Sequence, residues 1–435
     1  INWEIFELPG LNLEDVVVPI REFDNIPSEA EIEPMKKELI DSIDVLLEKD
    51  DISIDEAKSL SETIKSFVFS PLAYNKSLIK DYPLEKDSDT GTFFYISPVD
   101  EIINIDIDGN RESKDATKIE KMLIGFHNTM TPDHPDPVLD ISFRDYRGND
   151  NTYLSIIDKE HFFTKDDFEL ADHHFKGNFD AFGQFKGLIK IYKEKTFDHI
   201  VNWNGNNFKE TSCGEFEINL AYVQGNKRDS IIDSENYNRI TAKADKFGGL
   251  YVYKDNIRIL PYGDSDYDYL DIEKNRTKRA STYFFSYRRM FGVININQKN
   301  NFRLKEKAGR EGFIENKAFR QLQDILKNFF GQLAPDFFRE DNSAGPKAEA
   351  WVEKRRELKS AHLALERRDQ LATVRKDNFE KKIEQFFLEL KENKIENDVF
   401  DILNNSLLEF NAISSIKDHD IASQRLLDVE FQTRQ

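Results

Sequence analysis

The chain has 435 residues, of which 39% are hydrophobic and 12% aromatic, so it can bury a sizeable core and is not a disordered polyelectrolyte. Its 81 acidic and 61 basic residues give a formal net charge of −20, which excludes a uniformly basic surface of the kind that coats nucleic acid or anionic membrane. The single cysteine, Cys213, excludes an internal disulfide and a multi-thiolate metal site. With no apolar run long enough to span a bilayer, these features predict a cytoplasmic protein without a membrane partner.

The N-terminal segment is strongly acidic, with seventeen Asp or Glu and five Lys or Arg in residues 1–60. Within it, apolar side chains recur at helical spacing, which predicts amphipathic helices over residues 27–50 and 53–69, the second capped by Ser53 or Asp55. The chain begins with Ile1 instead of Met. We therefore expect it to be a piece of a longer polypeptide.

The middle of the chain, from about residue 102 to residue 330, alternates apolar and polar residues in the period of half-buried strands. The alternation predicts strands over residues 138–146, 153–158, 187–193, 215–223, 249–255, 257–263 and 291–297. Helical spacing predicts helices over residues 118–128, 233–247 and 315–333. Because strands and helices lack a regular βαβ rhythm, the predicted fold class is α+β with a mixed or antiparallel sheet.

The C-terminal region begins after the Gly- and Pro-containing segment 342–346. Residues 347–394 contain neither Gly nor Pro, which predicts a long helix or a helical hairpin. Apolar side chains recur there every seven residues, and this stripe would face another helix of the chain or a second subunit. The stripe consists of Trp351, Leu358, Leu365, Ala372, Phe379 and Phe386. Two shorter helices are expected at 399–413 and 420–431.

Most enzyme signatures are absent: the sequence has no P-loop, no GxGxxG after a strand, no HExxH and no GxSxG. His173 and His174 adjoin Asp172, but neighbouring side chains point in different directions on a helix or a strand. We therefore favour a structural role over a metal site for this pair. Cys213 is interpreted as an inert core or turn residue.

A basic segment interrupts the acidic chain, because residues 271–320 contain thirteen Lys or Arg and five Asp or Glu. It includes the loop RLKEKAGREG, with Lys305, Lys307 and Arg310, just before a predicted helix. Such a loop suits phosphate, since cations supply charge and backbone N–H groups supply donors. The alternative is a basic surface patch that balances the acidic N-terminal segment.

Several stretches of this region resemble the transducer region of bacterial GHKL-type ATPases, and the pattern is most similar to MORC-like and Hsp-chaperone-like ATP-binding proteins. The motifs are YVYKDNIRILPYG, FGVININ and KAGREGFIENKAF, and the segments LIGFHNTMTP, FGQFKGLIKIYK and CGEFEINLAYV also look like that family. The resemblance covers roughly residues 90–330.

The resemblance implies a transducer domain that follows a nucleotide-binding domain and supplies a basic residue to the γ-phosphate of ATP. Lys307 is the first candidate for that catalytic and phosphate-sensing role, with Lys305 and Arg310 as further phosphate-binding residues or as residues that fix the loop. The implied organisation is an acidic helical segment at 1–89, a transducer at 90–335 and a coiled-coil-like helical domain at 343–435.

The ATP site of such a protein also needs an Asn-bearing acidic helix, an Asp-x-Gly-x-Gly motif and a Gly-rich lid. The helix with Glu38 and Asp41 lacks the Asn, and the segment around Asp108 and Gly109 does not replace the second motif. ATP and Mg²⁺ are therefore expected to bind mainly to a domain that precedes Ile1, and this chain alone is not expected to hydrolyse ATP.

Two alternatives remain for the function. The first is a clamp or scaffold that binds DNA, because the helix at 347–394 contributes Arg355, Arg356, Arg367, Arg368, Arg375 and Lys376. The second is a chaperone-like protein-binding module, in a bacterial stress or antiviral defence complex. A homodimer or a multi-subunit complex is the expected assembly.

Overall fold

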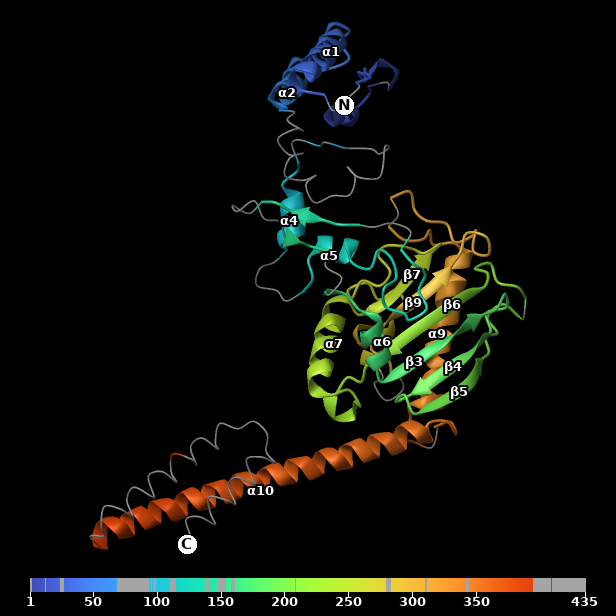
Figure 1. Ribbon diagram of the computed structural model, residues 1–435. Helices are drawn as coiled ribbons and strands as arrows, with labels where there is room; N and C mark the ends of the chain where they lie inside the picture. The colour runs from blue at the N-terminus through green and yellow to red at the C-terminus, as the bar shows by residue number, and fades with distance from the viewer. Residues whose placement is uncertain are drawn as a thin grey trace. The chain divides into compact units, whose positions relative to one another are not determined.

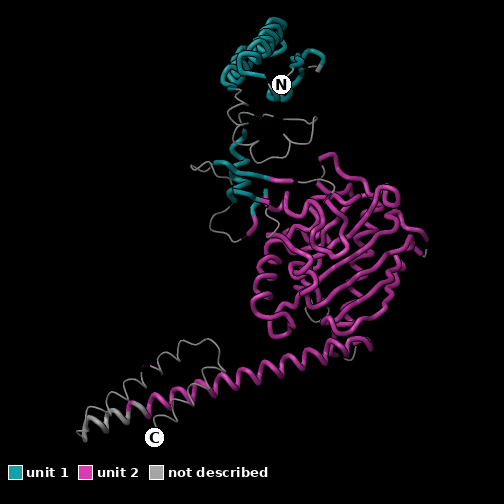
Figure 2. The backbone as a smooth tube through the Cα atoms, viewed as in Figure 1, with its two compact units in different colours: residues 1–113, 117–119, 143–156 teal, residues 114–116, 120–142, 157–435 magenta. Residues whose placement is uncertain are grey.

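The structure is a computed structural model of the 435-residue chain. It describes residues 2–11, 13–23, 27–68, 94, 96, 99–109, 115–137, 141–147, 154–157, 161–207, 209–278, 283–309, 311–341, 344–393 and 408. The chain divides into two compact units (Figure 2). Unit 1 comprises residues 1–113, 117–119 and 143–156, and unit 2 comprises residues 114–116, 120–142 and 157–435. The predicted domain borders at residues 89 and 343 stay predictions.

Unit 1 contains the two predicted N-terminal helices. They are α1 (Glu29–Glu48) and α2 (Ile54–Ser66), and they share a small apolar core that includes Ile43, Leu46 and Leu60. Ser53 caps α2, because its hydroxyl accepts the Glu56 N–H while its own N–H donates to the Glu56 carboxylate. The shorter elements of the unit are η1 (Trp3–Glu7), η2 (Leu13–Asp15), α4 (Ile102–Asp108), β1 (Arg144–Asp145) and β2 (Leu154–Ser155).

Unit 2 is built on a seven-stranded sheet of order β5-β4-β3-β6-β9-β7-β8 (Figure 1). Its strands are β3 (His173–Phe179), β4 (Phe185–Ile191), β5 (Lys195–Val201), β6 (Phe216–Tyr222), β7 (Gly249–Lys254), β8 (Ile257–Arg258) and β9 (Met290–Ile296). Neighbours pair antiparallel except β7 and β9, which are parallel. The unit also contains α6 (Lys165–Leu170), α7 (Ser234–Phe247), α8 (Ile272–Lys278), α9 (Lys317–Phe337), η6 (Lys227–Asp229), η7 (Tyr287–Arg289) and all but the first two residues of α5 (Lys118–Leu123). The predicted α+β class is confirmed.

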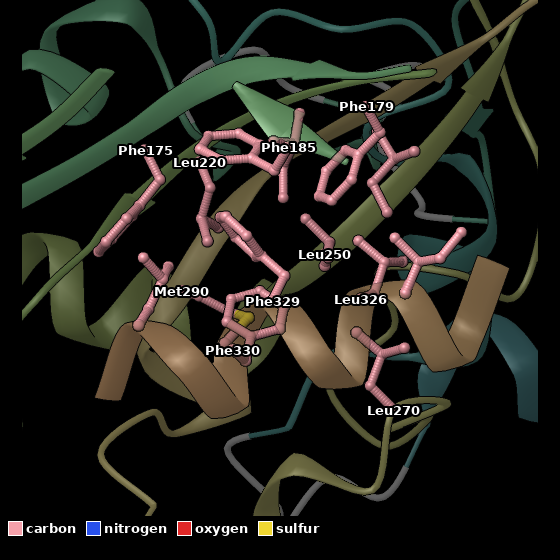
Figure 3. Close-up of a cluster of buried hydrophobic side chains, with 14 of the residues drawn as sticks. Phe175, Phe179, Phe185, Leu220, Leu250, Leu270, Met290, Leu326, Phe329 and Phe330 are labelled. Atoms are coloured by element: carbon pink, nitrogen blue, oxygen red, sulfur yellow. The ribbon is translucent and has the colours of Figure 1, made fainter. Parts of the chain in front are cut away.

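One face of this sheet packs on α9. Its helical stripe inserts Leu326, Phe329 and Phe330 among apolar side chains of the strands, such as Phe179 and Leu250 (Figure 3). Each of these side chains is at most 6% exposed. This cluster is the main core of unit 2, and it holds α9 against the sheet.

The opposite face of the same sheet packs on α6 and α7. Because side chains alternate across a strand, Leu250 and Val252 of β7 lie in the α9 core, while Tyr251 and Tyr253 lie in the second cluster with Phe247 of α7. The sheet is therefore covered on both faces at β6, β9 and β7. This explains why every residue of β7 is buried except Lys254 at its end, which is half-buried.

The C-terminal region is a single helix, α10 (Glu349–Asn393), so of the two predicted forms the continuous helix is confirmed over the described residues. Only its first turns meet the core of unit 2: Trp351 is buried and Leu358 packs against the same cluster. Leu365, the next residue of the sevenfold stripe, is 54% exposed. The stripe therefore contacts the chain's own core at its N-terminal end. Across the ranges that the structure describes, no helix combines the length and apolar character that a membrane span requires.

Candidate functional site

The loop between β9 and α9 contains the predicted phosphate-binding cations. Its two sides pair like a short hairpin: the Lys307 N–H donates to the Gly312 carbonyl over 2.9 Å, and the Ile314 N–H donates to the Lys305 carbonyl over 2.8 Å. Glu306 and Phe313 form an antiparallel bridge between these bonds. We call residues 305–314 the basic hairpin.

The second half of the basic hairpin, at Gly312 and Phe313, is fixed to the core of unit 2. Phe313 is 2% exposed, its ring stacks on Tyr262 with 5.3 Å between centroids, and its N–H donates to the Tyr262 hydroxyl over 3.0 Å. Gly312 has φ +95°, a conformation that L side chains rarely adopt. The Gly312 conformation and the contacts between Tyr262 and Phe313 together hold the hairpin at one position on the domain.

Two cations of the basic hairpin are free of partners among the described residues. Lys305 and Lys307 are exposed, and neither side chain makes an ion pair or a hydrogen bond with any residue that the structure describes. The acidic residue between them, Glu306, forms an ion pair with Lys254, with 2.9 Å between Oε1 and Nζ. Arg310, the third predicted cation, lies outside the described residues.

The basic segment 271–320 divides into two groups according to its ion pairs. Most described cations before β9 are paired, as in Lys274 with Asp271 at 3.3 Å and Arg288 with Asp266 at 3.1 Å, whereas Lys278 makes no ion pair within the described residues. After β9, the described cations make no ion pair within the described part of the chain; they are Lys299, Arg303, Lys305, Lys307, Lys317 and Arg320. The positive charge that remains available to an external anion is therefore concentrated around the basic hairpin and the start of α9.

The N-terminus of α9 follows the basic hairpin directly. Asn316 caps the helix, since its side-chain oxygen accepts the Phe319 N–H over 3.0 Å. Its amide group donates to the Arg303 carbonyl over 2.8 Å. The helix start is thus tied to the chain just before the hairpin, and its dipole adds to the positive potential there.

The paired histidines lie side by side in β3 and face opposite sides of the sheet. His173 is fully buried, where its Nδ1 accepts the Tyr192 N–H over 3.2 Å, and burial lowers its pKa well below the usual value. His174 Nε2 lies 2.6 Å from the Phe168 carbonyl, and burial lowers its pKa to about 4. The two rings therefore serve separate packing environments and share no ligand site.

Asp172 lies beside the histidines as a buried carboxylate. It accepts hydrogen bonds from the Gln224 N–H, the Ile231 N–H and the Ser230 hydroxyl at 2.8 to 3.0 Å. Burial raises its pKa to about 6 in spite of these bonds. The three donors join β3 to the segment after β6, which is a structural role.

Cys213 is also buried, and burial raises the pKa of its thiol to about 11. A thiol with a raised pKa is a poor nucleophile at neutral pH. Its Sγ lies 3.4 Å from the Thr211 hydroxyl. No cluster of three or more His, Cys, Asp or Glu side chains with metal-binding geometry occurs in the described ranges.

The N-terminal residues that superficially match a nucleotide site have other partners in unit 1. Glu38 pairs with Arg21, and Asp108 pairs with Arg147 at 2.8 Å. Asp41 is exposed on α1, and Gly109 ends α4 with φ +58°. The structure does not bring these residues together into a described pocket.

Comparison with known proteins gives no further assignment: no family model, no curated protein and no solved structure matches this chain.

Proposed function

We propose that this chain is the transducer and C-terminal helical part of a GHKL-type ATPase, which couples ATP binding and hydrolysis to conformational change and dimer closure. The observation that supports it best is the basic hairpin, where Lys305 and Lys307 stay unpaired while the rest of the loop is anchored. In this proposal ATP and Mg²⁺ bind mainly to a domain whose motifs this sequence does not contain. A cytoplasmic location, where ATP is available, belongs to the same proposal.

The proposed chemistry is electrostatic. Phosphoryl transfer is accelerated mostly by positioned positive charge, since negative charge is spread over the γ-phosphate oxygens in the transition state. An ammonium group that has no carboxylate partner keeps its full charge for that phosphate. Lys307 has this property, and its backbone is hydrogen-bonded across the hairpin, so the side chain starts from a defined position.

The proposed coupling runs through α9. This helix begins three residues after the hairpin ends and lies in the main core of unit 2 along most of its length. Its end is tied to the start of α10, because the Gly345 N–H donates to the Pro335 carbonyl over 2.8 Å. A force on the hairpin would therefore move the sheet, α9 and the base of α10 as one body.

The test is ATP turnover by a polypeptide that joins this chain to the nucleotide-binding domain. That polypeptide should hydrolyse ATP. Replacing Lys305, Lys307 or Arg310 by Ala, one at a time, should lower its turnover by about 10²-fold where the replaced side chain contacts the phosphate, the usual effect of losing a charge-stabilising group. Lys299→Ala is the matched control, because Lys299 is also exposed, is unpaired among the described residues and lies outside the hairpin. Unchanged turnover in all three hairpin variants would refute the proposed role of the loop.

A further inference from the structure

A pocket of about 620 Å³ lies in unit 2 where the base of α10 meets the sheet domain. Its walls come from the segment after β6, the C-terminal part of α8, the segment before β9, the end of α9 and the first turns of α10. This volume is in the range of pockets that hold small organic ligands. The pocket does not include the basic hairpin, so it is a separate feature from the proposed phosphate contact.

The apolar wall of the pocket is aromatic. Phe284 and Phe338 are stacked in parallel with 3.9 Å between ring centroids, and Trp351 meets both rings edge-on at 5.8 and 6.0 Å. Trp351 comes from α10, whereas Phe338 directly follows α9. An aromatic wall of this kind favours a flat apolar ligand body.

One buried donor in this wall has no acceptor. The Trp351 side chain is 94% buried, since its exposed fraction is 6%, and its indole Nε1–H has no hydrogen-bond partner. A buried donor without a partner destabilises the fold, and an acceptor atom of a ligand would supply the missing hydrogen bond.

A second donor is only weakly used. Arg276 has one ion pair, with Glu273 at 3.8 Å, and that glutamate also accepts the Ser286 hydroxyl. The guanidinium of Arg276 therefore keeps donors for an anionic group. In contrast, Arg355 is engaged, because it pairs with Asp229 at 3.2 Å and lies over the Trp351 ring at 4.9 Å.

We propose that this pocket binds a small aromatic or heteroaromatic acid, whose ring packs on Phe284, Phe338 and Trp351 and whose acidic oxygens accept from Arg276 and the Trp351 N–H. Such a ligand would touch the end of α9 and the base of α10 at once. It would therefore stabilise the attachment of α10 to the sheet domain, which otherwise depends on Trp351 and on ion pairs such as Arg355 with Asp229 and Lys354 with Glu194.

The test uses the full 435-residue chain and three aromatic acids, 2-naphthoate, 2-naphthalenesulfonate and 2-naphthyl phosphate, in isothermal titration calorimetry. The uncharged 2-naphthamide is the matched probe. We expect at least one acid to bind more than about tenfold more tightly than the amide, the effect of one charge-assisted hydrogen bond. Hydrogen exchange at saturation should show protection in residues 334–341 and 349–358.

Two variants separate the parts of the proposal. Trp351→Phe keeps an aromatic ring and removes the N–H, and it should weaken the acid about tenfold. Arg276→Gln changes a side chain that is 42% exposed, so the fold should survive, and it should abolish the preference for acid over amide. Lys186→Gln, which changes an exposed lysine on β4 outside the pocket, is the control and should bind as the original chain does.

Failure of all three acids to bind at millimolar concentration would overturn the proposal. Equal binding of acid and amide would overturn it too, as would protection confined to residues outside the two ranges. An Arg276→Gln chain that binds the acid with unchanged affinity would have the same consequence.

Discussion

The Tyr262 hydroxyl accepts the Phe313 N–H over 3.0 Å while the two rings stack at 5.3 Å. Tyr262 follows β8 and Phe313 belongs to the basic hairpin, so this pair joins segments that are 51 residues apart in sequence. Both side chains are at most 2% exposed. The contact fixes the hairpin to the domain without using its lysines.

Tyr262→Phe tests this anchor. The ring and its stacking remain, but the Phe313 N–H loses its acceptor in a buried position, so the free energy of unfolding should fall by about 1–2 kcal/mol. Urea unfolding monitored by circular dichroism measures this change. Tyr267→Phe is the control, since Tyr267 is 41% exposed and should change stability by less than about 0.5 kcal/mol. Equal effects of the two variants would contradict the anchor.

Asp167 gives a second prediction, because it is a fully buried carboxylate between Arg239 and Lys243. Burial alone would raise its pKa, but the hydrogen bonds and charges of its neighbours, Lys243 foremost, outweigh burial and lower it. Asp167→Asn leaves Lys243, whose side chain is 14% exposed, without its charged partner. We expect a loss of about 3 kcal/mol in the free energy of unfolding.

The neighbouring exposed Asp166 provides the control for that experiment. Asp166→Asn should alter the free energy of unfolding by less than about 0.5 kcal/mol in the same urea titration. A loss in Asp166→Asn as large as in Asp167→Asn would show that the buried ion pairs are not responsible.

The histidines predict how stability depends on pH. Burial lowers the pKa of His174 to about 4 and that of His173 in the same direction, whereas an unfolded histidine titrates near 6.5. Between these values the unfolded chain binds more protons, so acidification favours unfolding. Asp172 acts in the opposite sense, because its raised pKa of about 6 lets the folded state bind a proton that the unfolded state does not.

With two histidines against one aspartate, the free energy of unfolding should fall by about 2 kcal/mol between roughly pH 7 and pH 5. His174→Gln, which keeps a donor for the Phe168 carbonyl, should remove most of that fall. Urea unfolding at several pH values measures both chains. A stability that is flat over this range in the original chain would contradict the assignment of neutral buried histidines.

Much of the fold follows from local sequence pattern. The spacing of apolar residues predicts α7, α9 and the four strands β4, β6, β7 and β9, because each packs one face or both faces on a core. The spacing of apolar residues does not predict β3 and β5. In β3 the residues Lys176, Gly177 and Asn178 interrupt the apolar alternation, and β5 is an edge strand with four exposed positions.

Three predicted strands are much shorter in the structure, and one of them, 257–263, is reduced to β8 (Ile257–Arg258). The segments 138–146 and 153–158 form a two-stranded sheet of only two residues each, β1 and β2, over the described residues. The apolar positions of these segments are not buried against a large sheet, since Leu154 is 72% exposed. Alternation alone therefore overestimates strand length where no partner sheet covers one face.

The candidate site could be predicted only in part. The sequence places Lys305 and Lys307 in a Gly-containing loop before a helix, which the structure confirms. The anchoring by Tyr262 and the separation of paired from unpaired cations depend on contacts between distant segments, for which the sequence has no local signal. The same holds for the pocket, where Phe284, Phe338 and Trp351 meet from three segments.

Nucleic-acid binding is an alternative function whose expected outcome follows from the charges of α10. Its sequence interleaves Lys and Arg with nearly as many Asp and Glu, and Arg355 is already paired with Asp229. We therefore expect no tight binding of a fluorescent DNA duplex by this chain in anisotropy titrations. A DNA clamp would instead lose about 10³–10⁵-fold in affinity between about 50 and 200 mM salt. Observing such a salt dependence would favour the clamp.

The most direct test of the central claim is single-turnover ATP hydrolysis by a polypeptide that joins this chain to the nucleotide-binding domain that we propose for it. We predict that Lys307→Ala lowers the hydrolysis rate by about 10²-fold while its unfolding free energy changes by less than about 0.5 kcal/mol, and that Lys299→Ala leaves the rate unchanged. A Lys307→Ala protein that hydrolyses ATP at the original rate, together with unchanged Lys305→Ala and Arg310→Ala proteins, would contradict the account.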